Sequence, residues 1–214
     1  YAAKKMTAHE KKINFSVVKG SLDDIAGNAV TAARDGMRKY LDAIVAKVRK
    51  GYDADPFALL DAVDKVSLKP VETALTAMIR DAHADGIAHV QEETKGKREF
   101  AVVKNLPSVT PKAAIKYLKA KELEVKGATT DAARKSGKQA LLTAIKTGDG
   151  TEQTVQRLRR DLEPLTGGAD NEYDEDGELT NPSRLETIAR TVTTEAYNQG
   201  RLSEMRSLGE LIVP

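Results

Sequence analysis

The sequence has no cysteine and no tryptophan, and its 214 residues include only three Phe and six Tyr. The absence of cysteine excludes disulfides, thiolate-bound zinc, iron–sulfur clusters and thiol nucleophiles. The scarcity of aromatic residues argues against a β-sandwich or barrel, whose strands favour Val, Ile, Tyr and Phe. No apolar run approaches the roughly 20 residues of a transmembrane helix, and no signal peptide is recognisable. Because the chain starts at Tyr1 instead of Met, we expect it to be a piece of a longer product.

Charge is abundant but unevenly distributed. The 34 Lys and Arg residues nearly balance the 32 Asp and Glu residues, for a net charge of +2. Residues 1–50 carry eleven basic against five acidic residues, whereas residues 164–182 carry six acidic residues and no basic one. The pattern predicts a basic amino-terminal arm and an acidic loop on a nearly neutral body.

The longest predicted element is a helix over residues 21–51. Apolar residues recur there at helical spacing, with Ser21 as the expected N-cap and Gly51 as the stop. Gly27 and Gly36 lie inside this helix, and each costs roughly 1 kcal/mol relative to Ala. We therefore expect close helix contacts or a kink at these two glycines.

Shorter amphipathic segments follow, and together they predict a mainly α protein: an elongated multi-helix assembly with long amphipathic helices and few or no strands.

Residues 1–20 are interpreted as a basic arm that orders on a partner, with a short strand over 13–18. A frayed terminus is the alternative that the sequence alone favours. The expected regions are an amino-terminal helical region over 21–110, which includes a connector over 96–110 with a short strand at 100–103, and a carboxy-terminal helical region over 111–214. The helices after 21–51 are expected to start near Phe57, Pro70, Pro111, Thr130, Thr151 and Ser183, with stops at Gly96, Gly127, Gly148, just before Pro164 and near Gly209.

No sequence motif indicates catalysis. Phosphate-binding glycine loops and a nucleophile elbow are absent. His83 and His89 are six residues apart, so a helix turns them to different faces, and His9 is remote in sequence. The acidic loop places Gly177 as in a calcium loop but has Ser183 in place of the bidentate acid, which favours a solvated loop. We therefore predict no enzyme activity, no cofactor and no metal.

Two groups of lysines are candidates for contacting DNA phosphates without reading sequence. Few aromatic residues lie among them, so base stacking is not indicated. Solvated helix faces are the alternative interpretation. The candidate DNA-binding residues are Lys4, Lys5, Lys11, Lys12, Lys112, Lys116 and Lys119.

The last predicted helix carries a polar stripe opposite its apolar one. Such a stripe can make fixed hydrogen bonds to another helix or subunit. An exposed face with Tyr197 half-buried is the alternative. The candidate partner-binding residues are Arg190, Thr191, Thr194, Tyr197, Asn198 and Arg201.

This helix also carries a recognisable pattern: Ile188-Ala-Arg-Thr191, a short gap, then Ala196-Tyr-Asn198, Gly200 and Arg201. The pattern resembles the phage head-morphogenesis family of minor head proteins (Mu F-like), and the helix, Gly-turn, helix unit over 141–158 agrees with it. The resemblance covers roughly residues 128–205. The sequence departs from the family at 192–195, where members usually carry an acid directly after the Arg-Thr pair.

The resemblance implies a structural minor capsid protein of a tailed bacteriophage. Such a protein would associate with the portal and the inner capsid, in several copies per particle, and assist head assembly or DNA packaging and ejection. It would reside in the virion head near the portal vertex, and in the host cytoplasm during assembly, without a membrane partner. The alternative hypothesis is a sequence-independent binder of the phage's double-stranded DNA. A hydrolase is the third and least supported.

Overall fold

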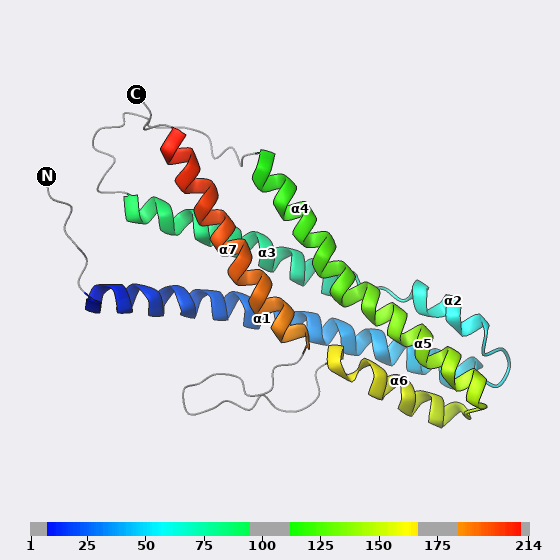
Figure 1. Ribbon diagram of the computed structural model, residues 1–214. Helices are drawn as coiled ribbons and strands as arrows, with labels where there is room; N and C mark the ends of the chain where they lie inside the picture. Colours follow the sequence, from blue (N-terminus) through cyan, green and yellow to red (C-terminus); the bar gives the residue numbers. More distant parts are fainter. Residues whose placement is uncertain (1–7, 95–111, 167–183, 211–214) are drawn as a thin grey trace, which may run out of the picture.

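A computed structural model describes residues 8–94, 112–166 and 184–210, and the described part consists of helices joined by short turns, with no strand (Figure 1). This confirms the predicted mainly α, multi-helix class. Lys4, Lys5, the predicted strand at 100–103 and the calcium-like loop lie outside the described residues. The elements are α1 (Ala8–Gly51), α2 (Ala58–Lys65), α3 (Lys69–Thr94), α4 (Lys112–Lys126), the π-helical turn η2 (Gly127–Asp131), α5 (Ala132–Thr147), α6 (Thr151–Thr166) and α7 (Arg184–Glu210).

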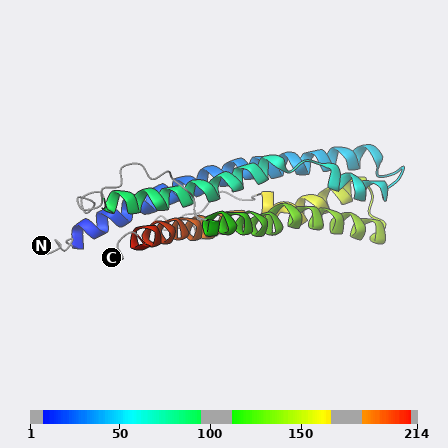
Figure 2. The same cartoon turned by 90° about the horizontal axis from the view of Figure 1, so that it is seen from above.

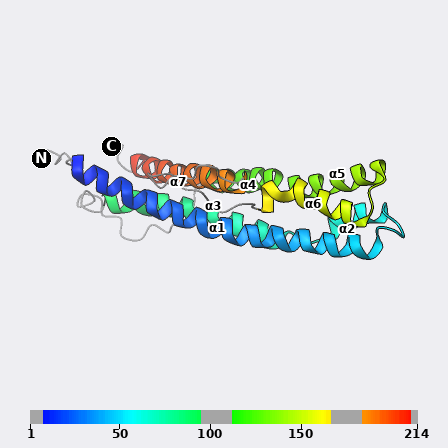
Figure 3. The same ribbon diagram turned by 90° about the horizontal axis from the view of Figure 1, so that it is seen from below.

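The helices form two consecutive four-helix segments. In one segment α1 packs on α2 and α6, and α5 closes the ring; in the other, α1, α3, α4 and α7 pack together. Both segments share α1. Helix α4, the turn η2 and helix α5 follow one another without a break and connect the two segments. Seen edge-on, the bundle has two layers, with α1 and α3 in one and α4, α5 and α7 in the other (Figures 2 and 3).

One hydrophobic core runs through both segments and joins the two predicted regions on either side of the connector. Met37, Tyr40 and Ile44 of α1 are at most 2% exposed. Alanines with no exposed surface allow the helices to approach closely, as the alanine-rich composition suggests. The alanines with 0% exposure are Ala33, Ala82, Ala133, Ala144, Ala189 and Ala196.

Helix α1 begins earlier than predicted. It starts at Ala8, so the predicted strand over 13–18 is wrong: these residues are helical, and the basic arm over 1–20 stays a prediction. The apolar stripe continues upstream, because Val18 and Leu22 pack against the same core that holds Ala26. Ser21 is therefore not an N-cap: it lies inside the helix and its hydroxyl donates to Asp85 Oδ2 at 3.2 Å.

The two glycines within α1 differ. A Cβ on Gly36 would lie 2.7 Å from Val71 Cγ2, so the predicted close helix contact holds there. A Cβ on Gly27 would meet nothing within 4 Å, and Gly27 is exposed. The composition of the helix alone could not distinguish the two positions.

The predicted stop at Gly127 is also wrong, because the chain passes through η2 directly into α5. Thr129 and Thr130 are buried in this turn, and their hydroxyls donate to the carbonyl oxygens of Val125 (2.7 Å) and Lys126 (3.2 Å). The wide turn thus hides two hydroxyls without leaving them unpaired. Gly148, with φ of 70°, does end α5 as predicted, whereas Pro164 lies inside α6 and not just past its end.

Candidate functional site

The residues predicted to bind a partner are divided between two sides of α7. Tyr197 is only 5% exposed, and its ring meets His89 edge-on with 5.6 Å between ring centroids. Arg201 donates to both carboxylate oxygens of Glu93 at 2.9 Å, and its guanidinium lies 5.9 Å from the Tyr197 ring centre. The hydrogen bonds to Glu93 raise the pKa of Arg201 further. Tyr197 and Arg201 therefore hold α7 to α3, so the predicted polar stripe is not one exposed face.

Two glycines set how closely α3 and α7 cross. A Cβ on Gly86 would overlap the carbonyl oxygen of Tyr197, and a Cβ on Gly200 would overlap that of His83. Each glycine thus faces the backbone of the other helix. Gly200 belongs to the family-like pattern, whereas Gly86 was not identified from the sequence. Its position four residues before Val90 and four after Ala82, both buried, is the signal that could have found it.

His83 lies in the same crossing and is 3% exposed, and its Nε2 has no hydrogen-bond partner among the described residues. Burial lowers the pKa of the imidazole below its ordinary 6.5 because the charged form is poorly solvated there. The folded protein therefore holds His83 neutral under conditions where the unfolded chain would begin to protonate it.

This difference predicts a pH-dependent stability. As the pH falls below about 6.5, the unfolded chain binds a proton at His83 before the folded chain does, so the free energy of unfolding decreases. The contribution is fully present above that pH and is lost toward the lower pKa of the folded state. Urea denaturation at pH 7.5 and pH 5.5 should show a larger decrease for the wild type than for His83→Leu. Equal decreases in the two proteins would contradict this assignment.

The other predicted residues lie on the outer side of α7. Thr191, Thr194 and Asn198 are exposed, and the Thr194 hydroxyl donates to the Arg190 carbonyl oxygen at 3.0 Å. Arg190 forms an ion pair with Asp23 of α1 at 3.8 Å. These residues are available to a partner, and binding by them stays a prediction.

Arg190 and Thr194 line a groove of about 300 Å³ between α1 and α7, here called the α1–α7 groove. Thr193 also lines it, is 1% exposed, and has a hydroxyl that finds no hydrogen-bond partner in the described part of the chain. Thr193 was not identified from the sequence; its position four residues after Ala189 and three before Ala196, both buried, is the signal that could have found it. The rest of the lining is supplied by Val18, Lys19, Leu22, Asp23 and Ala26 of α1.

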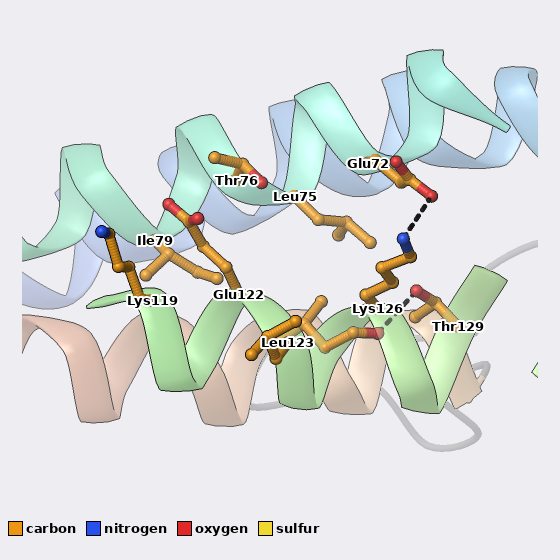
Figure 4. Close-up of a pocket in the computed structure, with 10 residues that line it drawn as sticks. Glu72, Leu75, Thr76, Ile79, Lys119, Glu122, Leu123, Lys126 and Thr129 are labelled. Carbon is orange, nitrogen blue, oxygen red and sulfur yellow. Dashed lines mark hydrogen bonds and ion pairs between the residues drawn. The ribbon is translucent and has the colours of Figure 1, made fainter. Parts of the chain in front are cut away.

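A second groove, of about 380 Å³, lies between α3 and α4 and is called the α3–α4 groove (Figure 4). Leu75 and Ile79 of α3 lie at its apolar floor, and both are at most 2% exposed. Lys126 of α4 forms an ion pair with Glu72 of α3 at 3.7 Å across the groove. Lys119 and Leu123 also line it.

The lysines predicted to bind DNA are exposed where the structure describes them. Lys112, Lys116 and Lys119 follow one another along α4, and none of them forms an ion pair within the described part of the chain. Lys11 and Lys12 belong to α1. Contact with DNA stays a prediction.

Within residues 8–94, 112–166 and 184–210, no group of three or more His, Cys, Asp or Glu side chains could hold a metal ion. None of the helices there is long and apolar enough to cross a membrane.

Comparison with known proteins adds no identification. No family model matches the chain, no curated protein matches it, and no solved structure matches it. The resemblance of residues 128–205 to minor head proteins therefore stays a prediction.

Proposed function

We propose that this protein is a structural minor capsid protein of a tailed bacteriophage, associated with the portal and inner capsid during head assembly. In this role it acts without chemistry of its own, as a rigid helical body that presents one side of α7 to its neighbours. Its proposed location is the virion head near the portal vertex, and the host cytoplasm before assembly.

The α1–α7 groove is the observation that carries this proposal. The inward residues of the family-like pattern, Tyr197 and Gly200, fix α7 against α3. The same helix then holds Arg190 and Thr194 in fixed positions at the groove on its other side. Positioning by a rigid, packed helix is what a specific protein interface needs, because less freedom is lost on binding.

The groove offers a chemically mixed surface to a partner. Val18 and Leu22 can pack against an apolar side chain, while the buried hydroxyl of Thr193 has no hydrogen-bond partner within the described residues. A partner carboxylate could approach Arg190, in competition with Asp23. A helix or loop of a portal subunit with one apolar side chain beside a carboxylate would match Val18, Leu22 and Arg190.

The double variant Arg190→Ala/Thr194→Ala tests this role. We expect its incorporation into phage particles to fall about tenfold, which corresponds to a loss of about 1.4 kcal/mol of binding, since a contact residue that contributes to binding costs more than about 1 kcal/mol when truncated. The measurement is the ratio of this chain to the portal protein in purified particles, by quantitative mass spectrometry. Wild-type incorporation of the double variant would contradict the role of the α1–α7 groove.

The matched control is Arg49→Ala/Thr143→Ala. Arg49 forms an exposed ion pair between helices, with Glu152 at 3.1 Å, as Arg190 does with Asp23. The Thr143 hydroxyl donates to the carbonyl four residues earlier at 2.8 Å, as the Thr194 hydroxyl does. The two double variants should have similar stability, so a difference in incorporation reports on the groove.

A further inference from the structure

We propose that the α3–α4 groove is a docking site for an acidic amphipathic helix of a partner protein. The proposal does not rest on the phage assignment. It rests on an apolar groove and on lysines of one of its walls that form no ion pair with the residues that the structure describes.

The groove is lined by buried apolar side chains of both helices and has one exposed leucine at its edge. Leu75, Ile79 and Val125 lie in its lining and are at most 2% exposed. Leu123 stands at its edge (Figure 4) and is 70% exposed, the highest value among the large apolar side chains that the structure describes. The volume of about 380 Å³ is within the range of sites that accept bulky groups. An apolar side chain entering it would cover Leu123, because the floor residues are already packed.

The acidic residues at the groove are already neutralised. Glu122 accepts from Nε and Nη2 of Arg80 at 3.0 and 2.9 Å, and Glu72 is paired with Lys126. The charge left over is positive, because Lys119, which lines the groove, has no ion pair within the described residues. An incoming acidic side chain would therefore meet attraction and little opposing charge.

The same face of α4 extends this pattern beyond the groove. Lys112, Lys116 and Lys119 are spaced by four and three residues, so they follow one side of the helix. Ile115, 44% exposed, lies beside them, and Leu123 continues the row one turn after Lys119. The 15 residues of α4 span about 22 Å. A partner helix of about four turns with acids at matching spacing would pair with the lysines while its apolar stripe covers Ile115 and Leu123.

This combination favours a helix over a nucleic acid. Phosphate contacts require cations but no apolar surface, and protein–DNA interfaces are more polar than protein–protein interfaces. Bound DNA would leave the apolar side chains of Ile115 and Leu123 exposed to solvent. Helices that dock in grooves use both an apolar stripe and flanking charge, as this surface does.

A designed 18-residue helical peptide, with Leu at i, i+3, i+4 and i+7 positions and Glu on the flanks, is a direct probe. Its binding to the full chain is measured by fluorescence anisotropy. Two comparison probes are measured in the same way: a peptide with Lys in place of each Glu, and a 20-base-pair DNA duplex. We expect the acidic peptide to bind at least tenfold more tightly than the basic one, and its affinity to decrease with added salt.

Two variants locate the site. We expect Leu123→Ser and Lys116→Glu/Lys119→Glu each to weaken binding of the acidic peptide about tenfold. The controls are Phe57→Ser, which removes another exposed apolar side chain (62% exposed), and Lys39→Glu/Lys47→Glu on α1, which reverses two exposed lysines elsewhere. All four changes lie on exposed side chains, so the fold should persist.

Several outcomes would overturn the proposal. One is equal binding of the acidic and basic peptides, and another is unchanged affinity in the groove variants. Tighter binding of the duplex, with displacement of the peptide, would assign the surface to nucleic acid. Self-association abolished by Leu123→Ser, without peptide binding, would assign it to a second copy of the chain.

Discussion

Replacing Gly200 with alanine should strongly destabilise the protein. The new Cβ would overlap the carbonyl oxygen of His83 and lie 3.0 and 3.2 Å from that residue's C and Cα atoms. These are backbone atoms, so α3 and α7 must separate and lose packing along the whole crossing. We expect the free energy of unfolding to fall by about 3 kcal/mol, at the upper end for inserting a methyl group into a packed site. Gly86→Ala should behave similarly, because its Cβ would overlap the Tyr197 carbonyl.

Gly27→Ala is the matched control for this prediction. Gly27 also lies inside a long helix, but it is exposed and a Cβ there would meet nothing within 4 Å. The substitution should stabilise the protein by up to about 1 kcal/mol through helix propensity alone. Urea denaturation followed by circular dichroism measures all three variants. If Gly200→Ala proves as stable as Gly27→Ala, the helices do not cross as closely as described.

Removing the Tyr197 ring should have an effect of similar size. Tyr197→Ala deletes a ring that is 5% exposed and in contact with His89 and Arg201, and the cavity between α3 and α7 cannot close easily against a packed backbone. We expect a loss of about 4 kcal/mol in the free energy of unfolding. Calorimetry or urea denaturation measures it. A Tyr197→Ala variant of wild-type stability would show that Tyr197 is not a core residue.

Tyr197→Phe separates packing from hydrogen bonding at this position. The phenol oxygen is a weak partner for Arg201 Nη1, at 3.4 Å, and Arg201 keeps its two bonds to Glu93. The loss should therefore stay within about 1 kcal/mol. An assembly defect caused by Tyr197→Ala would therefore reflect lost stability. Substitutions of Arg190 and Thr194, in contrast, test the α1–α7 groove itself.

Local signals explain which parts of the fold the sequence could predict. The apolar stripes of α1 and α3 and the stop at Gly148 depend on residues close in sequence, and each was predicted within a few residues, apart from the start of α1. Gly127 gave the same local signal as Gly148 but does not stop its helix. It is followed by two threonines whose burial depends on the rest of the bundle. A stop signal is a preference that packing can override.

The candidate site was harder to predict, because its character depends on contacts between residues far apart in sequence. Arg201 meets Glu93 across 108 residues, and nothing near either residue indicates the pair. Tyr197 has a polar tip and an apolar ring, so helical spacing alone placed it equally well on a polar or an apolar stripe. The α3–α4 groove was not anticipated for the same reason: its floor and its lysines come from two separate helices.

The copy number of this chain in intact phage particles tests the proposed function most directly. Purified particles would be digested, and peptides of this chain quantified by mass spectrometry against those of the portal and the major capsid protein. The proposal predicts a fixed, low copy number close to that of the portal and far below that of the capsid protein. Absence of the chain from the particles would contradict it.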